Sequence, residues 1–224
     1  PKSGGFPPFL CLKAERFIGI PDDLDTDDAA LIEPASVAFH AVRQSRLKVG
    51  DIVCVVGCGP IGLLTAQVAK AAGAGIVIAV EPDESRRNLA LATGSDIAVA
   101  PGEDLHATLE EVTQGLRADL VYDCAGIPQT MQQSVDMVRR GGSVCLVGVT
   151  GEEARINPIR WISKEITLNT SIVFTLEEMK ATANMIQDGR IAVAALRNGV
   201  VDLDALGSTI DDLAHRRLDA VKIL

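Results

Sequence analysis

The sequence predicts a doubly wound α/β fold, in which a parallel sheet is covered by helices on both faces. Strand-like and helix-like segments alternate from residue 52 to residue 149. The strand-like segments are nearly continuous Val, Ile, Leu and Ala, which indicates that both of their faces are buried. A glycine-rich turn with Gly57, Gly59 and Gly62 joins the first of these strands to the first helix. These three observations favour a parallel sheet with crossover helices.

The alternating pattern predicts each element in turn. Apolar runs predict strands at 52–56, 75–80, 96–99, 120–124 and 143–149. The segments between them predict helices at 60–72, 83–93, 105–115 and 129–138. Gly94 closes the second helix, and Gly141 and Gly142 precede the last strand.

The turn after the first strand has the spacing of a dinucleotide-binding Rossmann unit. Gly57 permits the tight turn, Gly59 lets the backbone approach a pyrophosphate, and Gly62 lets the helix pack close to the strand. The first amides of the helix then face the phosphates. Glu81 follows Gly62 by 19 positions, where an acid accepts hydrogen bonds from the ribose.

The ends of the chain do not follow this alternation. The first part predicts strands at 9–12 and 17–20, and Thr26 is the expected N-cap of a long helix that runs to about residue 45. The last part predicts a strand at 200–203, a helix at 204–215 and a strand at 220–224. Both ends therefore look like parts of a second domain that the central one interrupts. Because the first residue is Pro1 and not Met, we expect further sequence upstream.

Composition excludes several classes of protein. The net charge of −9 argues against a nucleic-acid partner. We expect no membrane association, because no apolar run approaches the roughly 18–20 residues of a membrane span and no signal peptide opens the chain. The five cysteines form no Cys-x-x-Cys pair and predict buried, reduced thiols in a cytoplasmic protein. His40, His106 and His215 lie too far apart to suggest a metal site.

Segments 31–42 (LIEPASVAFHAV), 49–53 (VGDIV) and 57–62 (GCGPIG) resemble the zinc-type medium-chain dehydrogenases. The branch most similar is that of the sorbitol (polyol) and threonine dehydrogenases. The resemblance implies that residues 1–24 are a remnant of a GroES-like catalytic domain. It implies a dinucleotide-binding Rossmann domain at 25–195 and a segment at 196–224 that returns to the catalytic domain.

The resemblance also implies an activity, in which hydride passes from a secondary alcohol or polyol to NAD while a zinc ion polarises the hydroxyl. Most zinc ligands of that family would precede Pro1, so this chain alone is expected to be inactive. Glu33 is the one candidate ligand that remains, and a surface glutamate on a helix is the alternative interpretation.

The charge of Glu81 favours NAD over NADP, because it would repel a 2′-phosphate. Arg86 matches a family position beside the adenosine ribose, with an exposed helix arginine as the alternative, whereas Arg87 leaves phosphate binding possible. The remaining positions are apolar or small, and sheet core is the competing interpretation for the apolar ones. The expected cofactor-binding residues are Gly57, Gly59, Pro60, Ile61, Gly62, Glu81, Arg86, Ala125, Val147, Gly148, Val149, Ser171 and Val173.

Two other functions stay open: a non-catalytic nucleotide-binding module and an NADPH-dependent, zinc-free reductase of the same superfamily. The runs at 159–162 and 166–172 predict a hairpin at the edge of the sheet. The resemblance implies that this region pairs with its copy, which predicts a homodimer or homotetramer through residues 159–172. The alternative is that the chain covers its own hairpin and that Trp161 is core.

Overall fold

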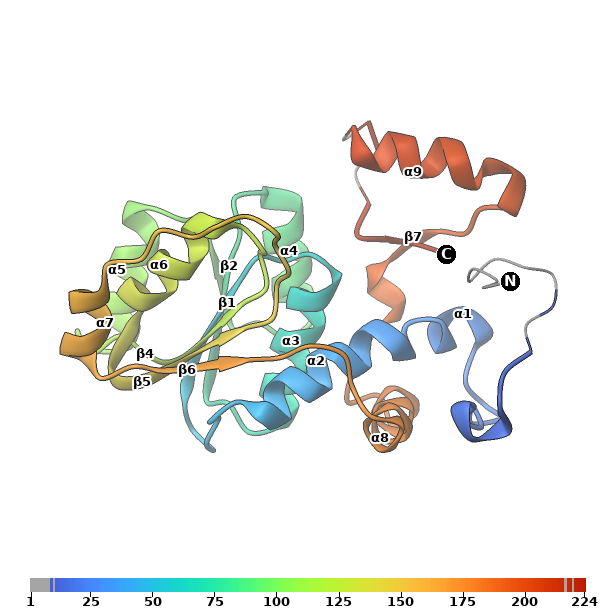
Figure 1. The fold of residues 1–224 in the computed structure, drawn as a ribbon, viewed down its shortest axis with the longest axis horizontal. Helices are drawn as coiled ribbons and strands as arrows, with labels where there is room; N and C mark the ends of the chain where they lie inside the picture. Colours follow the sequence, from blue (N-terminus) through green and yellow to red (C-terminus); the bar gives the residue numbers. More distant parts are fainter. Residues whose placement is uncertain (1–8, 10, 216, 219) are drawn as a thin grey trace.

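The computed structural model describes residues 9, 11–215, 217–218 and 220–224 of the chain. Its main sheet has six parallel strands in the order β3-β2-β1-β4-β5-β6 (Figure 1). The strands are β1 (Ile52–Val56), β2 (Ile76–Val80), β3 (Ile97–Val99), β4 (Ala118–Asp123), β5 (Val138–Leu146) and β6 (Thr167–Thr170). This is the order of a doubly wound Rossmann sheet, so the predicted fold class is confirmed.

Helices connect the strands and flank the sheet (Figure 1). They are α1 (Thr26–Ala29), α2 (Ile32–Gln44), α3 (Pro60–Ala71), α4 (Glu84–Ala92), α5 (Glu103–Val112), α6 (Pro128–Met137), α7 (Pro158–Lys164), α8 (Leu176–Gln187) and α9 (Leu206–Ala214). Short 3₁₀ turns occupy Ala14–Arg16, Ala194–Leu196 and Leu203–Ala205. The four helices predicted between residues 60 and 138 are all present, with ends shifted by at most three residues.

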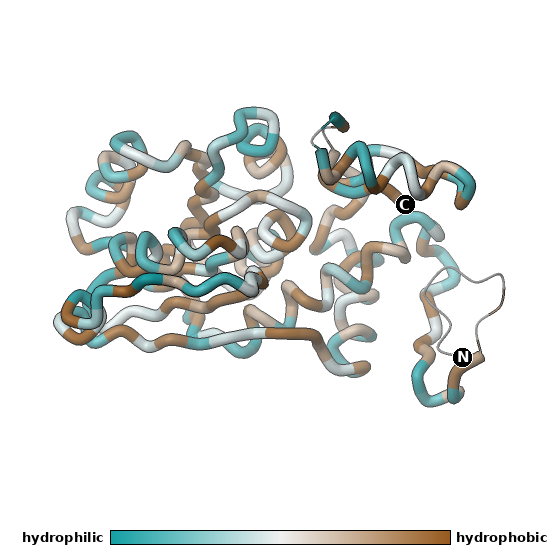
Figure 2. Tube along the Cα trace, turned by 45° about the horizontal axis from the view of Figure 1, so that its top comes forward, coloured by the Kyte–Doolittle hydropathy of each residue, from teal (hydrophilic) through white to brown (hydrophobic). Residues whose placement is uncertain are grey.

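Alternate residues of each inner strand face two different apolar clusters. Val53 and Val55 of β1 belong to the cluster built with α2, α3 and α8, whereas Cys54 and Val56 face α5 and α6. All four residues are buried. In Figure 2 the tube is brown over much of the sheet, and teal recurs along the outer helices. Burial on both faces explains why the strands lack a polar alternation.

The segment before the sheet differs from its prediction. Residues 17–20 form no strand, nor do Phe9, Cys11 and Leu12; residues 1–8 and 10 lie outside the described residues. The helix predicted from Thr26 to about residue 45 is two helices, α1 and α2. Asp25, not Thr26, is the N-cap, because its carboxylate accepts hydrogen bonds from the Asp27 and Asp28 amides.

The hairpin predicted at the sheet edge is wrong. Residues 158–164 form the helix α7, and β6 pairs in parallel with β5. Pro158 suits the first turn of a helix. Contacts with α6 and with the first residue of β5 then hold this helix: Trp161 Nε1 donates to Gln132 Oε1 at 3.2 Å, and Lys164 Nζ donates to the Val135 and Val138 carbonyls at 2.6 and 2.7 Å.

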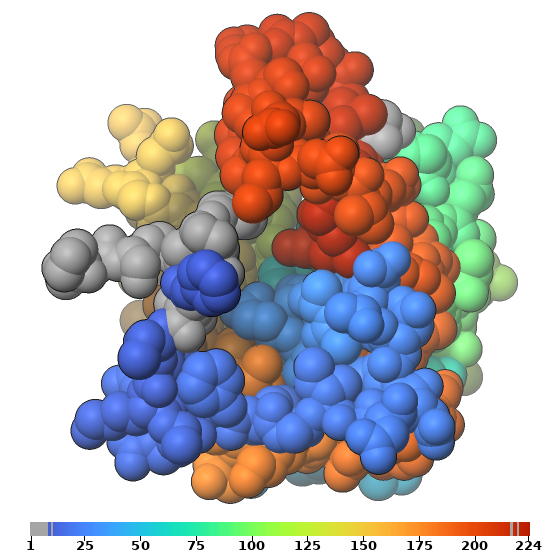
Figure 3. Space-filling view, turned by 90° about the vertical axis from the view of Figure 1, so that its right-hand side faces the viewer, coloured from blue at the N-terminus to red at the C-terminus, as the bar shows by residue number. Residues whose placement is uncertain are grey.

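In Figure 3 the blue segment that precedes the sheet adjoins the orange and red segment that follows it. Strands β7 (Arg197–Gly199) and β8 (Lys222–Ile223) form a small parallel pair, so the strand predicted at 200–203 lies three residues earlier. The Arg197 guanidinium contacts carboxylate oxygens of Asp25, Asp27 and Asp28 at 2.8 to 3.4 Å. This cluster, named the Arg197 clasp below, joins the segment that enters the sheet unit to the segment that leaves it.

The cysteines of this chain are free thiols. Burial raises the pKa of Cys54, Cys58 and Cys145 to about 12. Cys11 is exposed, so the prediction of burial is wrong for this residue, which lies outside the sheet unit. Within the described ranges, no helix has the length and apolar character required to cross a bilayer.

Candidate functional site

The turn between β1 and α3 has the conformation that its glycines predict. Gly57 has φ of +88°, and a Cβ there would lie 2.9 Å from Ala125 Cα. A Cβ on Gly62 would lie 1.8 Å from the Gly57 carbonyl oxygen, so α3 packs directly on the turn. A Cβ on Gly59 would meet no atom within 4 Å. Gly57 and Gly62 are thus required by contacts inside the protein, whereas Gly59 faces open space.

Glu81 directly follows β2 and is buried against this turn. Its Oε2 accepts a hydrogen bond from the Cys58 amide at 2.7 Å, and its Oε1 accepts one from the Asp83 amide at 3.1 Å. Burial raises the pKa of the Cys58 thiol, and the charge of Glu81 adds to this effect. A carboxylate has about four acceptor positions, so two of them stay available for hydroxyl donors.

The two arginines that follow have different surroundings. Arg87 Nη1 donates to the carbonyl oxygens of Glu81 and Pro82 at 2.9 and 2.6 Å, which fixes the turn between β2 and α4. The Arg86 guanidinium forms no hydrogen bond or ion pair with other described residues, and it borders a cavity beside Glu81. Of the two arginines, Arg86 is thus the one that borders the cavity and has no side-chain partner among the described residues.

A cavity of about 440 Å³ lies at the carboxyl ends of β1, β2 and β4, and we name it the switch-point cavity. It lies where the strand order reverses between β1 and β4, which is the usual ligand position in open α/β sheets. Its volume is within the range of small-molecule sites. It is lined by Val56, Gly57, Gly59, Val80, Glu81, Pro82, Arg86, Pro101, Cys124, Ala125, Ile127, Gln129, Thr130, Gln133 and Met137.

The structure brings together five of the expected residues and adds others. Gly57, Gly59, Glu81, Arg86 and Ala125 line the switch-point cavity, while Pro60, Ile61 and Gly62 form the adjoining first turn of α3. The residues that sequence reasoning missed include Pro101 and one face of α6, formed by Thr130, Gln133 and Met137. Their spacing of three and four positions just after the turn at 123–126 is the signal that could have identified that face.

Asp123 organises the turn between β4 and α6. Its Oδ2 accepts a hydrogen bond from the Thr130 hydroxyl at 2.8 Å, and its Oδ1 accepts one from the Ala125 amide at 3.2 Å. Burial raises the pKa of this carboxyl despite those hydrogen bonds. Its backbone carbonyl accepts from the Val147 and Gly148 amides at 2.9 and 2.8 Å, which ties β4 to the end of β5.

The remaining expected residues follow β5 and β6 at the same edge of the sheet but do not line the cavity. Val147 is buried, Val149 is 78% exposed, and a Cβ on Gly148 would lie 2.3 Å from the Gly126 nitrogen. Ser171 is buried, and its hydroxyl has no partner among the described residues. Val173 is exposed with φ of +62°, a backbone conformation that a β-branched residue rarely adopts.

Glu33 lies exposed in the first turn of α2. In the part of the chain that the structure describes, no three His, Cys, Asp or Glu side chains come together in a way that could hold a metal ion. A protein zinc site ordinarily needs three or four ligands. The residues present therefore do not form a zinc site by themselves. Of the three histidines, His40 is bound to Glu178, while His106 and His215 are exposed.

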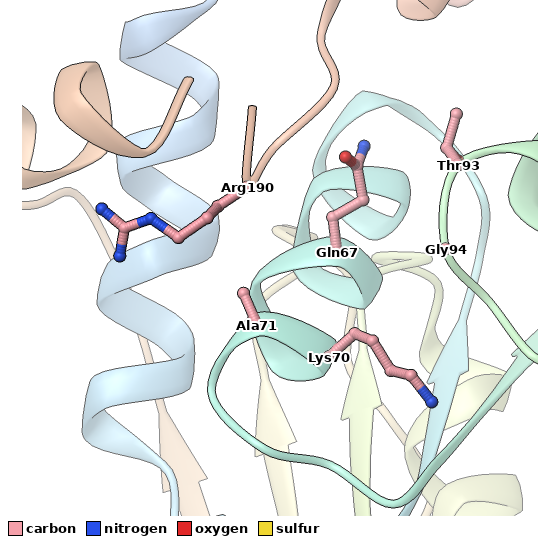
Figure 4. Close-up of a pocket in the computed structure, with 6 residues that line it drawn as sticks. All are labelled: Gln67, Lys70, Ala71, Thr93, Gly94 and Arg190. Atoms are coloured by element: carbon pink, nitrogen blue, oxygen red, sulfur yellow. The ribbon is translucent and has the colours of Figure 1, made fainter. Parts of the chain in front are cut away.

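A second cavity of about 300 Å³ lies beside α3 and includes Lys70 and Arg190 (Figure 4). Both cations are already paired: Lys70 with Asp96 at 2.7 Å and Arg190 with Asp188 at 2.8 Å. Figure 4 shows their side chains pointing away from each other. This cavity thus offers no converging set of free polar groups, unlike the switch-point cavity.

The comparisons with known proteins all indicate the same family. Residues 60–188 match the model of the zinc-binding dehydrogenase family. The (R,R)-butanediol dehydrogenase of Bacillus subtilis is 33% identical over 91% of this chain, and the sorbitol dehydrogenase of Halalkalibacterium halodurans is 34% identical over 75%. A Sinorhizobium meliloti protein described as a zinc-binding dehydrogenase, solved with NADP bound, is 31% identical over 85% of this chain, with a TM-score of 0.79. The chain spans 58%, 50% and 57% of the lengths of these three relatives.

Proposed function

Because this chain belongs to the zinc-binding dehydrogenase family, we propose that it is the coenzyme-binding portion of an NAD-dependent alcohol or polyol dehydrogenase. NAD would lie in the switch-point cavity. The observation that carries the proposal is the position of this cavity, bounded by the open side of Gly59 and by the Glu81 carboxylate. The free cysteines fit a cytoplasmic location, which we propose as well.

The glycine turn would bind the pyrophosphate. Gly59 leaves space at the point where any Cβ would project toward the ligand. Pro60 has no N–H, but the N–H groups of Ile61 and Gly62 belong to the first turn of α3, where amides lack partners within the helix. These amides and the helix dipole favour an anion there. Gly57 would keep the turn tight enough for this approach.

Glu81 would select NAD over NADP. Its free acceptor positions suit the two adenosine ribose hydroxyls, whereas a 2′-phosphate would meet its negative charge. Arg87 is held by two carbonyl groups, which argues against a role in phosphate binding. Arg86 would lie beside the ribose. The S. meliloti relative has NADP bound, so coenzyme choice is the point that needs measurement.

The test is a fluorescence titration of the purified chain with NADH and NADPH. We expect the wild type to bind NADH at least tenfold more tightly, and we expect Glu81→Gln to reduce this ratio because the repelling charge is removed. Using the ratio within each variant cancels any general weakening caused by loss of the Cys58 contact. Arg87→Ala is the matched control and should leave the ratio unchanged. Equal or tighter binding of NADPH by the wild type would favour the NADPH-dependent reductase instead.

The nicotinamide would extend toward the ends of β5 and β6. Val147, Gly148 and Val149 follow β5, while Ser171 and Val173 follow β6. Gly148 lets that strand end approach Gly126 closely. The Ser171 hydroxyl, which has no hydrogen-bond partner among the described residues, and the positive φ of Val173 support a ligand role for the second segment. Sheet core remains the competing interpretation for the buried Val147.

In the whole protein, the coenzyme would accept a hydride from a secondary alcohol, giving a ketone and a released proton. Glu33 is proposed as one zinc ligand, but the described residues supply no complete metal site. The alternative is a nucleotide-binding module without catalysis. A search for further metal ligands in any sequence that precedes Pro1 would distinguish the two, since a dehydrogenase of this family requires them.

A further inference from the structure

The switch-point cavity continues into a smaller compartment of about 160 Å³. Three residues line both spaces: Pro101, Gln133 and Met137. They mark the boundary between the two compartments. Met137 is buried and Pro101 is exposed, so this boundary has an apolar floor and an open rim.

The polar side chains on this part of α6 differ in whether they are engaged. The Thr130 hydroxyl donates to Asp123, and Gln132 accepts from Trp161 Nε1 and from the Asn157 amide. The Gln133 side chain makes no hydrogen bond or ion pair with the described residues, and it is exposed and borders both compartments. The Gln129 side chain likewise has no partner in the described part of the chain, but it borders the larger compartment only.

If the proposed function holds, the dinucleotide has a fixed direction in the cavity. Gly59 marks the phosphates and Glu81 the ribose hydroxyls, so the adenine extends past Glu81 toward Pro101, Gln133 and Met137. Pro101 and Met137 supply apolar contacts for its ring. A glutamine amide offers one acceptor and donors that match the edge of adenine, whose amino group donates and whose ring nitrogens accept.

We propose that Gln133 is a specificity-determining residue for the coenzyme, and that its side-chain carbonyl accepts a hydrogen bond from the 6-amino group of adenine. This inference rests on the proposed function and adds recognition of the base to it. Thr130 is less suited to this role, because its side chain is buried and borders only the larger compartment, whereas Gln133 is exposed and borders both. Gln133 is exposed, so its substitution should leave the fold intact.

The experiment compares the affinities of ADP and purine riboside 5′-diphosphate, which lacks the 6-amino group, by calorimetric titration. We expect the wild type to prefer ADP by about three- to tenfold, the size of one neutral hydrogen bond. Gln133→Leu should abolish the preference. Gln133→Glu should keep it, because a carboxylate oxygen still accepts. Gln129→Leu is the matched control on the same helix and should also keep it.

The inference is overturned if the wild type shows no preference, if Gln133→Leu retains it, or if Gln129→Leu removes it. Two results distinguish failure of the proposed function from failure of this inference. Failure of the wild type to bind NADH would overturn that proposal and this inference together. Normal NADH binding with an unchanged base preference in Gln133→Leu would overturn the inference alone.

Discussion

Replacing Gly62 with alanine tests whether the close packing of α3 on the glycine turn is obligatory. In an ordinary helix this change stabilises by up to about 1 kcal/mol. Here the new Cβ would lie 1.8 Å from the Gly57 carbonyl oxygen, and the two must move apart by about 1.2 Å to reach even 3.0 Å. The obstacle is backbone and cannot rotate away, so we expect an overpacking cost near the top of the usual range of about 1–3 kcal/mol.

The net loss of about 2 kcal/mol would appear in a urea denaturation curve. With a slope of about 2 kcal/mol per molar, the midpoint should fall by about 1 M. Moving the turn also displaces the amides proposed to bind the pyrophosphate. Losing one charge-assisted hydrogen bond of about 1.5 kcal/mol should weaken NADH binding roughly tenfold.

Two alanine controls separate stability from binding. Gly207 of α9 has no atom within 4 Å of a built Cβ, so Gly207→Ala should be neutral or stabilise by up to about 1 kcal/mol. Gly59→Ala has equal room and should unfold like the wild type, yet its Cβ would occupy the proposed phosphate position and weaken NADH binding. A wild-type urea midpoint for Gly62→Ala would refute the packing argument.

Three further outcomes are expected. Burial alone would raise the pKa of Glu178, but hydrogen bonds from Thr175 and His40 outweigh it and lower that pKa. The stabilisation from this carboxylate is therefore present above its unfolded pKa and is lost as pH falls. Glu178→Gln should weaken the dependence of the free energy of unfolding on pH in the acidic range. The chain should form a homodimer or homotetramer through residues 159–172, where the outer edge of β6 pairs with no other described strand and Leu168 is 44% exposed. Light scattering should detect the oligomer, and Leu168→Lys should give a monomer. The purified chain should not reduce NAD with an alcohol, with or without added zinc, because the described residues assemble no three-ligand site; zinc-dependent turnover would contradict this.

The sheet unit could be predicted because its signals are local. Each inner strand is an apolar run, and the glycines that begin or end helices lie next to them in the chain. Helix α7 could not be predicted in this way, because Ile-Arg-Trp-Ile also fits a strand and short apolar runs do not distinguish the two. Its helical form depends on hydrogen bonds from Trp161 and Lys164 to α6, more than twenty-five residues earlier.

The residues of the candidate site also fall into two groups, those that local sequence signals identify and those that only the fold brings together. Gly57, Gly59 and Glu81 carry spacing information, so they could be identified before the structure was known. Gln133 and Met137 come to the cavity only because α6 crosses its opening, and their residue types carry no signal of their own. The break between α1 and α2 at residues 30–31 also escaped prediction, and the Asp25 cap lies one residue before the expected Thr26.

The Arg197 clasp has a consequence for protein engineering. The chain enters the sheet unit beside Asp25 and leaves it beside Arg197, and these two points are joined by ion pairs although more than 170 residues separate them. A unit whose two ends lie together can be grafted into a loop of another protein without spreading that loop apart. Cuts just before Asp25 and just after Arg197 would therefore define a segment that can be transferred to another protein. This segment keeps the three aspartates and the arginine, whose ion pairs join its two ends.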